Sequence, residues 1–408
     1  MNVAVSIAGL ALLILIHEAG HFFVARAVGM RPRKFYLFFP PALVKRVRNG
    51  IEYGIGSIPL GGYVKIPGMH RPAPRDLESH FARALEEVPW LGRHISAVKK
   101  PLAEDRLAEA RAALPELAAV LEKTELSEAA RRAAERGLTE VDDGLSDDAY
   151  WRAAPWKRIA VIFAGPATNL VFAVALLAVV FAIGIPVGAT RTVEEISPGT
   201  PAAAAGLRPG DVIVAVDGRE AKSFGDVSSR IRASQGRPIT VSVLRDGRPV
   251  ELEPVQPRRI DGRFRLGFIP TAFYKSYGPG ASIVRAFDET GEVTVAIGQS
   301  LGRIVSGAGR EDVASPVGIV QGSSRALEQG FRYYLAILAL ISLSLALLNL
   351  LPLLPLDGGH IAFSIAEAVR RRPIPREAYE RVSVIGIAVV LMLFVIGLSN
   401  DINRLNDG

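Results

Sequence analysis

Length, composition and charge already restrict what this chain can be. Its 408 residues would suffice for two or three soluble domains, but the hydrophobic residues, 49% of the total, gather in a few long runs with almost no charges, which indicates a membrane protein. The absence of cysteine excludes disulfides and thiolate chemistry, so any metal must be held by histidines and carboxylates. The formal net charge of +7 does not indicate nucleic-acid binding, because basic and aromatic residues are not interleaved; it fits loops that face anionic lipid headgroups.

Four apolar segments are predicted to cross the membrane. Segments 159–186, 333–356 and 382–398 with its flanks reach the length of about 18 residues that a helix needs to span the hydrocarbon core. The first run, 3–28, is interrupted by a polar cluster of His17, Glu18 and His21. No basic segment precedes this run and no small-residue cleavage pattern follows it, so we expect a retained span and not a cleaved signal peptide.

Basic clusters beside the spans predict one topology. They follow the first span, precede the second and separate the third from the fourth, and by the positive-inside rule all three lie on the cytoplasmic side. The N-terminus, residues 187–331 and the C-terminus are then expected on the outer side. The clusters are Arg26, Arg31, Arg33 and Lys34; Arg152, Lys157 and Arg158; and Arg370, Arg371, Arg372, Arg376 and Arg381.

Two different segments separate the first two spans. The Gly-rich stretch 51–67 mixes β-branched and aromatic residues with glycines, which predicts short strands near the bilayer surface. Residues 76–148 are rich in Ala, Glu, Arg and Leu with helical periodicity, which predicts a small cytoplasmic helical insertion of structural or regulatory use.

A soluble α/β module is predicted at 192–270. Asp217-Gly218 and Asp246-Gly247 are typical of hairpin turns, and they are flanked by the strand-like segments VIVAV and ITVSVL. Residues 224–233 have helical spacing between them.

The sequence HEAGH, from His17 to His21, matches the pattern H-E-x-x-H. On a helix the two histidines lie one turn apart on one face and can share a zinc ion, while Glu18 lies next to the metal and can accept a proton from water that attacks a peptide carbonyl. Three ionisable residues inside a span are energetically costly, which favours a metal site over polar residues satisfied by neighbouring helices.

Catalytic zinc usually takes a third protein ligand, and the best candidate is Asp357. It lies in NLLPLLPLDGGH (349–360), where Pro352 and Pro355 break the third span and two glycines permit close backbone approach. His360 is a competing ligand, but it lies farther from the apolar run and is interpreted as a capping or supporting histidine.

Together HEAGH, FAGPATN (163–169), a PDZ-like module and NLLPLLPLDGGH closely resemble the site-2 protease family, in its bacterial branch that regulates extracytoplasmic stress sigma factors. The resemblance covers nearly the whole chain except the insertion. It implies that His17, His21 and Asp357 bind zinc and that Glu18 is the catalytic base. It further implies that Asn349, Gly61 and Gly62 contact substrate, the glycines belonging to a membrane-associated β-hairpin.

Residues 193–218 resemble a single PDZ domain in the bacterial, circularly permuted order, with 265–270 closing its peptide groove, where an extended peptide or a C-terminus would bind. The expected fold is a polytopic α-helical membrane protein with four transmembrane helices, a membrane-associated β-hairpin and an inserted α/β PDZ domain. The expected segments are helix 1 (1–30), hairpin region (31–75), helical insertion (76–150), helix 2 (157–186), PDZ domain (190–272), connector (273–330), helix 3 (331–360), cytoplasmic loop (361–381) and helix 4 (382–400).

The resemblance implies an inner-membrane zinc endopeptidase that cleaves single-span membrane proteins, such as anti-sigma factors or remnant signal peptides, with the PDZ domain in the periplasm. Two other interpretations fit the sequence less well. A non-proteolytic scaffold that captures peptides at the PDZ groove has no obvious use for Glu18 beside metal ligands. A metal transporter would be expected to show internal repeats and several sites along a path.

Overall fold

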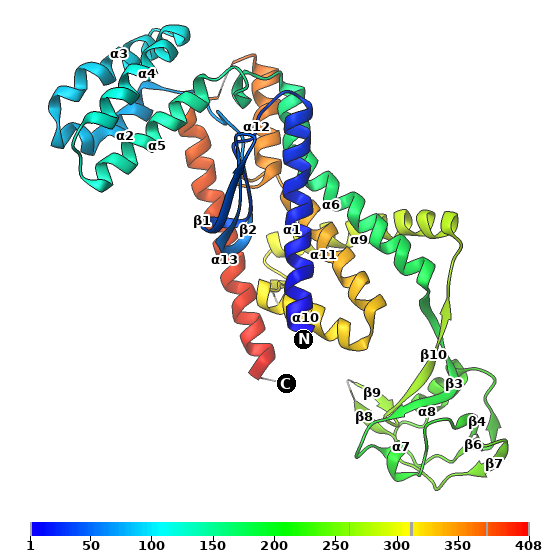
Figure 1. Cartoon of the computed structure of the whole chain (residues 1–408). Coiled ribbons are helices and arrows are strands. Elements are labelled where there is room, and N and C mark those ends of the chain that lie inside the picture. The colour runs from blue at the N-terminus through cyan, green and yellow to red at the C-terminus, as the bar shows by residue number, and fades with distance from the viewer. Residues whose placement is uncertain (1, 261, 311–312, 373, 407–408) are drawn as a thin grey trace. The chain divides into compact units, whose positions relative to one another are not determined.

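The computed structural model describes residues 2–406 except 261, 311–312 and 373, and Figure 1 labels its helices and strands. The chain divides into two compact units. The membrane unit comprises Met1–Leu177 and Ala286–Gly408, and the strand-rich unit comprises Ala178–Arg285.

Four helices of the described residues are long and apolar enough to cross a membrane: α1 (Asn2–Ala27), α6 (Pro155–Ile183), α11 (Phe331–Asn349) and α13 (Arg376–Asn406). The prediction of a mostly helical chain with four long apolar helices is therefore confirmed, and the protein is an integral membrane protein. Apolar side chains on α13 are exposed, as at Val384 (68%) and Val395 (62%), as expected of a helix that faces lipid.

The ends of the second and third spans differ from the predicted ones. α6 ends at Ile183 and the chain continues as a strand from Ile185, inside the segment expected to be helical. α11 ends at Asn349, before Pro352 and Pro355, because proline cannot continue a helix. A loop then leads to α12 (Asp357–Arg370).

The predicted cytoplasmic loop 361–381 is mostly helical. α12 extends to Arg370 and α13 begins at Arg376, so the connection is much shorter than expected. Apolar residues of α12 recur at helical spacing, and Ser364 is buried on one face, which explains why the helix continues beyond the metal-binding motif.

The Gly-rich region forms a curled pair of long strands, β1 (Lys34–Arg48) and β2 (Ile51–Lys65). Because β2 bends back on itself, residues 34–37 align both with 52–55 and with 62–65, as in the pairs of Lys34 with Glu52 and with Lys65. Residues 62–65 are paired on one side only among the described strands, which leaves a free backbone edge.

The predicted insertion is a bundle of short helices: α2 (Pro74–Glu87), the 3₁₀ turn η1 (Pro89–Leu91), α3 (Gly92–Ala103), α4 (Leu107–Lys123) and α5 (Glu128–Leu145). Its apolar faces share one core that includes the fully buried Leu77, Phe81 and Leu91. Asp143 at the end of α5 pairs with Arg33 Nε (3.0 Å) and Lys65 Nζ (2.6 Å), which ties the bundle to the β1–β2 strands. A 3₁₀ turn, η2 (Tyr150–Arg152), precedes α6.

The strand-rich unit contains a six-stranded sheet with the order β10-β3-β4-β6-β7 and with β5 beside β4. Its core includes Ile213 and Val241 of the sheet and Val227 of α8, all nearly fully buried. The predicted hairpin turns are present: Asp217-Gly218 and Asp246-Gly247 have positive φ angles of 50°, 68°, 49° and 77°. The elements are β3 (Ile185–Ile196), α7 (Pro201–Ala204), β4 (Val212–Val216), β5 (Arg219–Glu220), α8 (Phe224–Ala233), β6 (Val241–Arg245), β7 (Arg248–Glu251), β8 (Arg258–Ile260), β9 (Arg263–Arg265) and β10 (Phe268–Lys275).

Two helices, α9 (Pro279–Val305) and α10 (Pro316–Gln329), lead from this sheet to α11. The first turn of α10 is capped by α13, because the Asp401 carboxylate accepts hydrogen bonds from the backbone amides of Ser315 (2.8 Å) and Gly318 (3.0 Å). The end of the last span is thereby fixed against the segment that precedes the third.

Candidate metal centre

Three predicted metal ligands meet inside the membrane unit. His17 and His21 project from one face of α1 and are each 7% exposed, and Asp357 is the first residue of α12. The two Nε2 atoms are 3.2 Å apart, and Asp357 Oδ2 lies 3.2 Å from His17 Nε2 and 3.4 Å from His21 Nε2. Residues 336 positions apart in the chain are thus neighbours.

These distances fit a zinc ion. Bonds of about 2.0–2.1 Å at tetrahedral angles place neighbouring ligand atoms about 3.3 Å apart, and the three observed edges, 3.2, 3.2 and 3.4 Å, match one face of such a tetrahedron. Asp357 Oδ2 is buried and has no hydrogen-bond donor among the described residues, as expected of an atom that binds a metal. Among the described residues, His17, His21 and Asp357 are the one group of three histidine or carboxylate side chains close enough together to hold a metal ion.

The rings are oriented by helix α6. His21 Nδ1 lies 2.8 Å from the carbonyl oxygen of Val161 and donates its proton there, which leaves the Nε2 lone pair for the metal. His17 Nδ1 lies 3.5 Å from the Asn169 side-chain amide, whose Oδ1 is buried and has no hydrogen-bond partner among the residues that the structure describes. Because the two ends of an amide are assigned from its hydrogen bonds, we assign the turned amide, in which Oδ1 accepts the proton of His17 Nδ1.

Glycines let α6 approach this face of α1. A side chain at Gly20 would overlap Ala164 and Thr168, and one at Gly165 would overlap the imidazole rings of both histidines. Thr168 Oγ1 lies within hydrogen-bond distance of the Gly165 carbonyl of its own helix (2.8 Å) and of the Ile16 carbonyl of α1 (3.1 Å). Small residues and interhelical hydrogen bonds are the means by which helices associate in lipid.

A tight loop delivers Asp357. A side chain at Gly358 would overlap the carbonyl oxygens of Leu350 and Leu351, and one at Gly359 would overlap the backbone of Leu354. The two glycines predicted to permit close approach are therefore required by the fold. His360 lies outside the metal group, with its ring centroid 6.5 Å from that of Tyr379, so the structure groups Asp357 and not His360 with the histidines.

Strand β2 passes directly over Glu18. A side chain at Gly62 would overlap the Glu18 carboxyl group, whereas one at Gly61 would meet the ring of Phe39. Of the residues predicted to contact substrate, Gly62 thus lies at the site and Gly61 faces the hairpin's own aromatic side chain. Asn349 ends α11, and its side chain makes no hydrogen bond within the described part of the chain.

The sequence did not indicate the roles of Val161, Gly165 and Asn169, although FAGPATN was recognised as a motif. The signal available was a run of small and polar residues within an otherwise apolar span, which is typical of a helix-packing surface.

An integral membrane protein with two histidines and a carboxylate arranged for zinc around an H-E-x-x-H helix is a membrane-embedded zinc metalloprotease. The sequence model of peptidase family M50 matches residues 5–393 of this chain. The chain therefore belongs to this family, the site-2 protease family of zinc metalloproteases.

Relatives match over nearly their whole length. A protein from Brucella suis biovar 1 is 30% identical, covering 96% of this chain and 93% of its own. Metalloprotease MmpA from Caulobacter vibrioides is 29% identical over 97% of this chain and 94% of its own, and zinc metalloprotease RasP from Oceanobacillus iheyensis is 28% identical over 96% of each.

Proposed function

We propose that this zinc metalloprotease is an intramembrane endopeptidase that cleaves single-span membrane proteins, with His17, His21 and Asp357 as zinc ligands and Glu18 as the base. The observation that carries the proposal is the passage of β2 across Glu18 at Gly62, inside a unit built from membrane helices. The free edge of residues 62–65 would hold an extended substrate segment by strand addition next to the metal ligands.

Each residue has a distinct part in this reaction. Zinc, when bound, supplies Lewis acidity that polarises the scissile carbonyl and acidifies water. Glu18 accepts the proton of the attacking water and returns it to the leaving amine. Val161 and Asn169 hold the histidine tautomers, and the strand edge keeps the substrate extended, because a helical peptide bond is shielded by its own hydrogen bonds.

We further propose that the strand-rich unit is a PDZ domain and that it helps to select substrates by binding a peptide or C-terminus. A cavity of about 510 Å³ lies between α8 and residues 263–270, with Phe224, Ile231 and Phe268 among its lining. It adjoins β10, which among the described strands pairs with β3 alone and therefore leaves an edge to which a peptide or C-terminus could add. Filling the cavity with Ser228→Trp should abolish peptide binding, whereas Ser229→Trp, one residue away and outside the lining, should not.

The basic clusters support a topology in which the helical insertion is cytoplasmic and the strand-rich unit lies outside, which in a bacterial inner membrane is the periplasm. The substrate class that the family resemblance suggests is a single-span protein such as an anti-sigma factor or a remnant signal peptide.

The decisive experiment compares wild type with Glu18→Gln, using a tagged single-span protein whose span contains helix-destabilising residues. Cleavage and bound zinc are measured together. We expect cleavage by wild type only and equal zinc in both proteins, because the amide cannot accept a proton. Glu86→Gln, an exposed change on α2, is the matched control and should cleave normally. Cleavage by the Glu18→Gln protein would exclude Glu18 as the base. If wild type binds zinc but does not cleave the substrate, the result would favour the alternative of a non-proteolytic membrane scaffold.

A further inference from the structure

A basic cleft lies where two membrane spans begin. Two adjoining cavities of about 820 and 780 Å³ share Arg71, Asp105 and Trp151 as a common wall. Trp151 belongs to η2, four residues before α6, and the second cavity is also lined by Arg371, Arg372, Ile374 and Pro375, which lie between α12 and α13. The cleft is therefore built from the helical insertion and from the ends of membrane helices.

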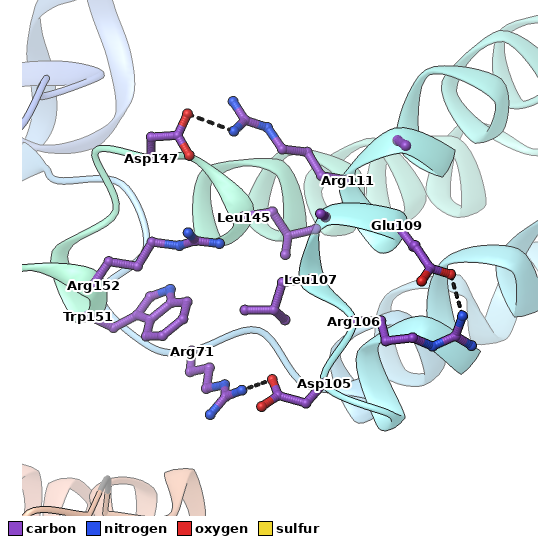
Figure 2. Close-up of a pocket in the computed structure, with 12 residues that line it drawn as sticks. Arg71, Asp105, Arg106, Leu107, Glu109, Arg111, Leu145, Asp147, Trp151 and Arg152 are labelled. Atoms are coloured by element: carbon purple, nitrogen blue, oxygen red, sulfur yellow. Dashed lines mark hydrogen bonds and ion pairs between the residues drawn. The ribbon is translucent and has the colours of Figure 1, made fainter.

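The first cavity contains one arginine without an acidic partner. Arg71, Arg106 and Arg111 are paired with Asp105, Glu109 and Asp147. Figure 2 shows Arg152 extending beside the Trp151 ring, and Leu107 and Leu145 are among the apolar residues that line the same cavity. The Arg152 guanidinium lies 5.1 Å from the centre of that ring, and no carboxylate of the described residues pairs with it.

The second cavity adds two more such arginines. Arg371 and Arg372 are exposed and have no ion-pair partner within the described ranges, whereas the neighbouring Arg158 is neutralised by Glu367 at 2.5 Å. Arg371 directly follows α12 and has a φ of 54°, the left-handed conformation in which many helices end.

The surroundings of the cleft are those of a membrane–water boundary. Trp156, in the first turn of α6, is 63% exposed and stacks with Lys157 at 5.7 Å, as aromatic and basic residues do at the level of lipid headgroups. Val369, two residues before Arg371 in the chain, is 79% exposed, so the end of α12 also presents an apolar side chain at its surface. An amphiphile with a negative head would match both features.

We propose that this cleft, lined by Arg152, Arg371 and Arg372 around Trp151, binds the phosphate headgroup of an acidic phospholipid. Guanidinium groups pair with phosphate through parallel N–H···O bonds, and an anion relieves the mutual repulsion of unpaired cations. If these arginines served only to orient the membrane spans, their positive charge would suffice and no cavity would be needed. The proposal depends on the chain being an integral membrane protein and is independent of its proteolytic activity.

The test uses the full-length protein with Trp151 as reporter. The chain has three tryptophans, so Trp90→Phe combined with Trp156→Phe leaves the one in the cleft. Its fluorescence is titrated in detergent with dihexanoyl phosphatidylglycerol, with dihexanoyl phosphatidylcholine and with inorganic phosphate. We expect saturable change with phosphatidylglycerol only. Equal response to phosphatidylcholine would overturn an acidic-headgroup site, and saturation by phosphate at equal affinity would assign the cleft to a soluble anion.

Variants that remove equal charge distinguish lipid binding in the cleft from a general attraction of acidic lipid to basic residues. In the single-tryptophan protein, Arg371→Gln with Arg372→Gln should weaken phosphatidylglycerol binding about tenfold or more. Arg370→Gln with Arg381→Gln removes the same charge from flanking positions outside the cavity lining and should leave affinity unchanged. Equal weakening by both pairs, or by neither, would overturn the proposal. Zinc content, measured in each variant, reports that the membrane unit is intact.

Discussion

Helices α1 and α6 meet in the membrane unit where side chains are smallest, at Gly20 and Gly165, whereas sheet and helix in the strand-rich unit meet through large apolar side chains such as Ile213 and Val227. The difference reflects the solvent. In lipid, burying an apolar side chain gains little, so close backbone approach and hydrogen bonds hold the helices. In water, removal of apolar surface stabilises the fold. The metal centre should therefore be sensitive to added atoms and the sheet to removed ones.

The largest effect is expected for Gly165→Ala. The added methyl would overlap the rings of His17 and His21 and force them out of the zinc geometry. Bound zinc and protease activity should both fall about 100-fold or more, as measured by metal analysis and substrate cleavage. Gly298→Ala on α9, where the methyl meets nothing within 4 Å, is the control and should retain both. Full zinc in Gly165→Ala would contradict the packing described here.

Removing atoms from the strand-rich unit should give the opposite pattern. Ile213 is fully buried, and Ile213→Ala should cost about 2–4 kcal/mol of stability through lost burial and a cavity. Limited proteolysis of the whole protein should then cut within 178–285 while bound zinc stays unchanged. Loss of zinc along with this cleavage would show that the two units do not unfold separately.

A smaller effect is expected at Asn169, which tests whether hydrogen bonds orient the centre. Asn169→Ala deletes the group beside His17 Nδ1 without adding bulk, and zinc affinity should fall about tenfold. Competition with a chelator measures this affinity. Asn169→Asp, which keeps an acceptor for the Nδ1 proton, should retain more of it than alanine, and the reverse order would contradict the assigned tautomer.

The smallest effect, in the strand-rich unit, depends on pH. Burial alone would raise the pKa of Asp211, but hydrogen bonds from Arg245 (2.8 Å) and the Arg208 backbone amide outweigh it and hold that pKa below its ordinary value. Its stabilising contribution is thus complete above about pH 4 and is lost as pH falls through the lowered pKa. Asp211→Asn should cost about 1–2 kcal/mol at pH 7, and this cost should shrink as the pH falls below about 4. Proteolytic susceptibility of 178–285 across pH measures both.

Several features could be predicted because they depend on short stretches of chain. The i, i+4 spacing of His17 and His21 places them on one helix face wherever that helix lies. The four apolar runs, the two Asp-Gly turns and the helical insertion likewise follow from local pattern and composition. The third ligand was predicted because Asp357 stands in a loop that prolines and glycines make conspicuous.

Other features were decided by tertiary structure. Three features join residues 44 to 220 positions apart: the contact of Gly62 with Glu18, the support of His21 by Val161, and two cavities that share Trp151, one lined by Arg152 and the other by Arg371 and Arg372. No periodicity encodes such pairs. The sequence by itself determined the helices, the metal-binding motif and the family, because local hydrogen bonding and hydrophobicity specify them; only packing decided which backbone lies over Glu18 and which arginines remain unpaired, because those depend on how distant surfaces fit together.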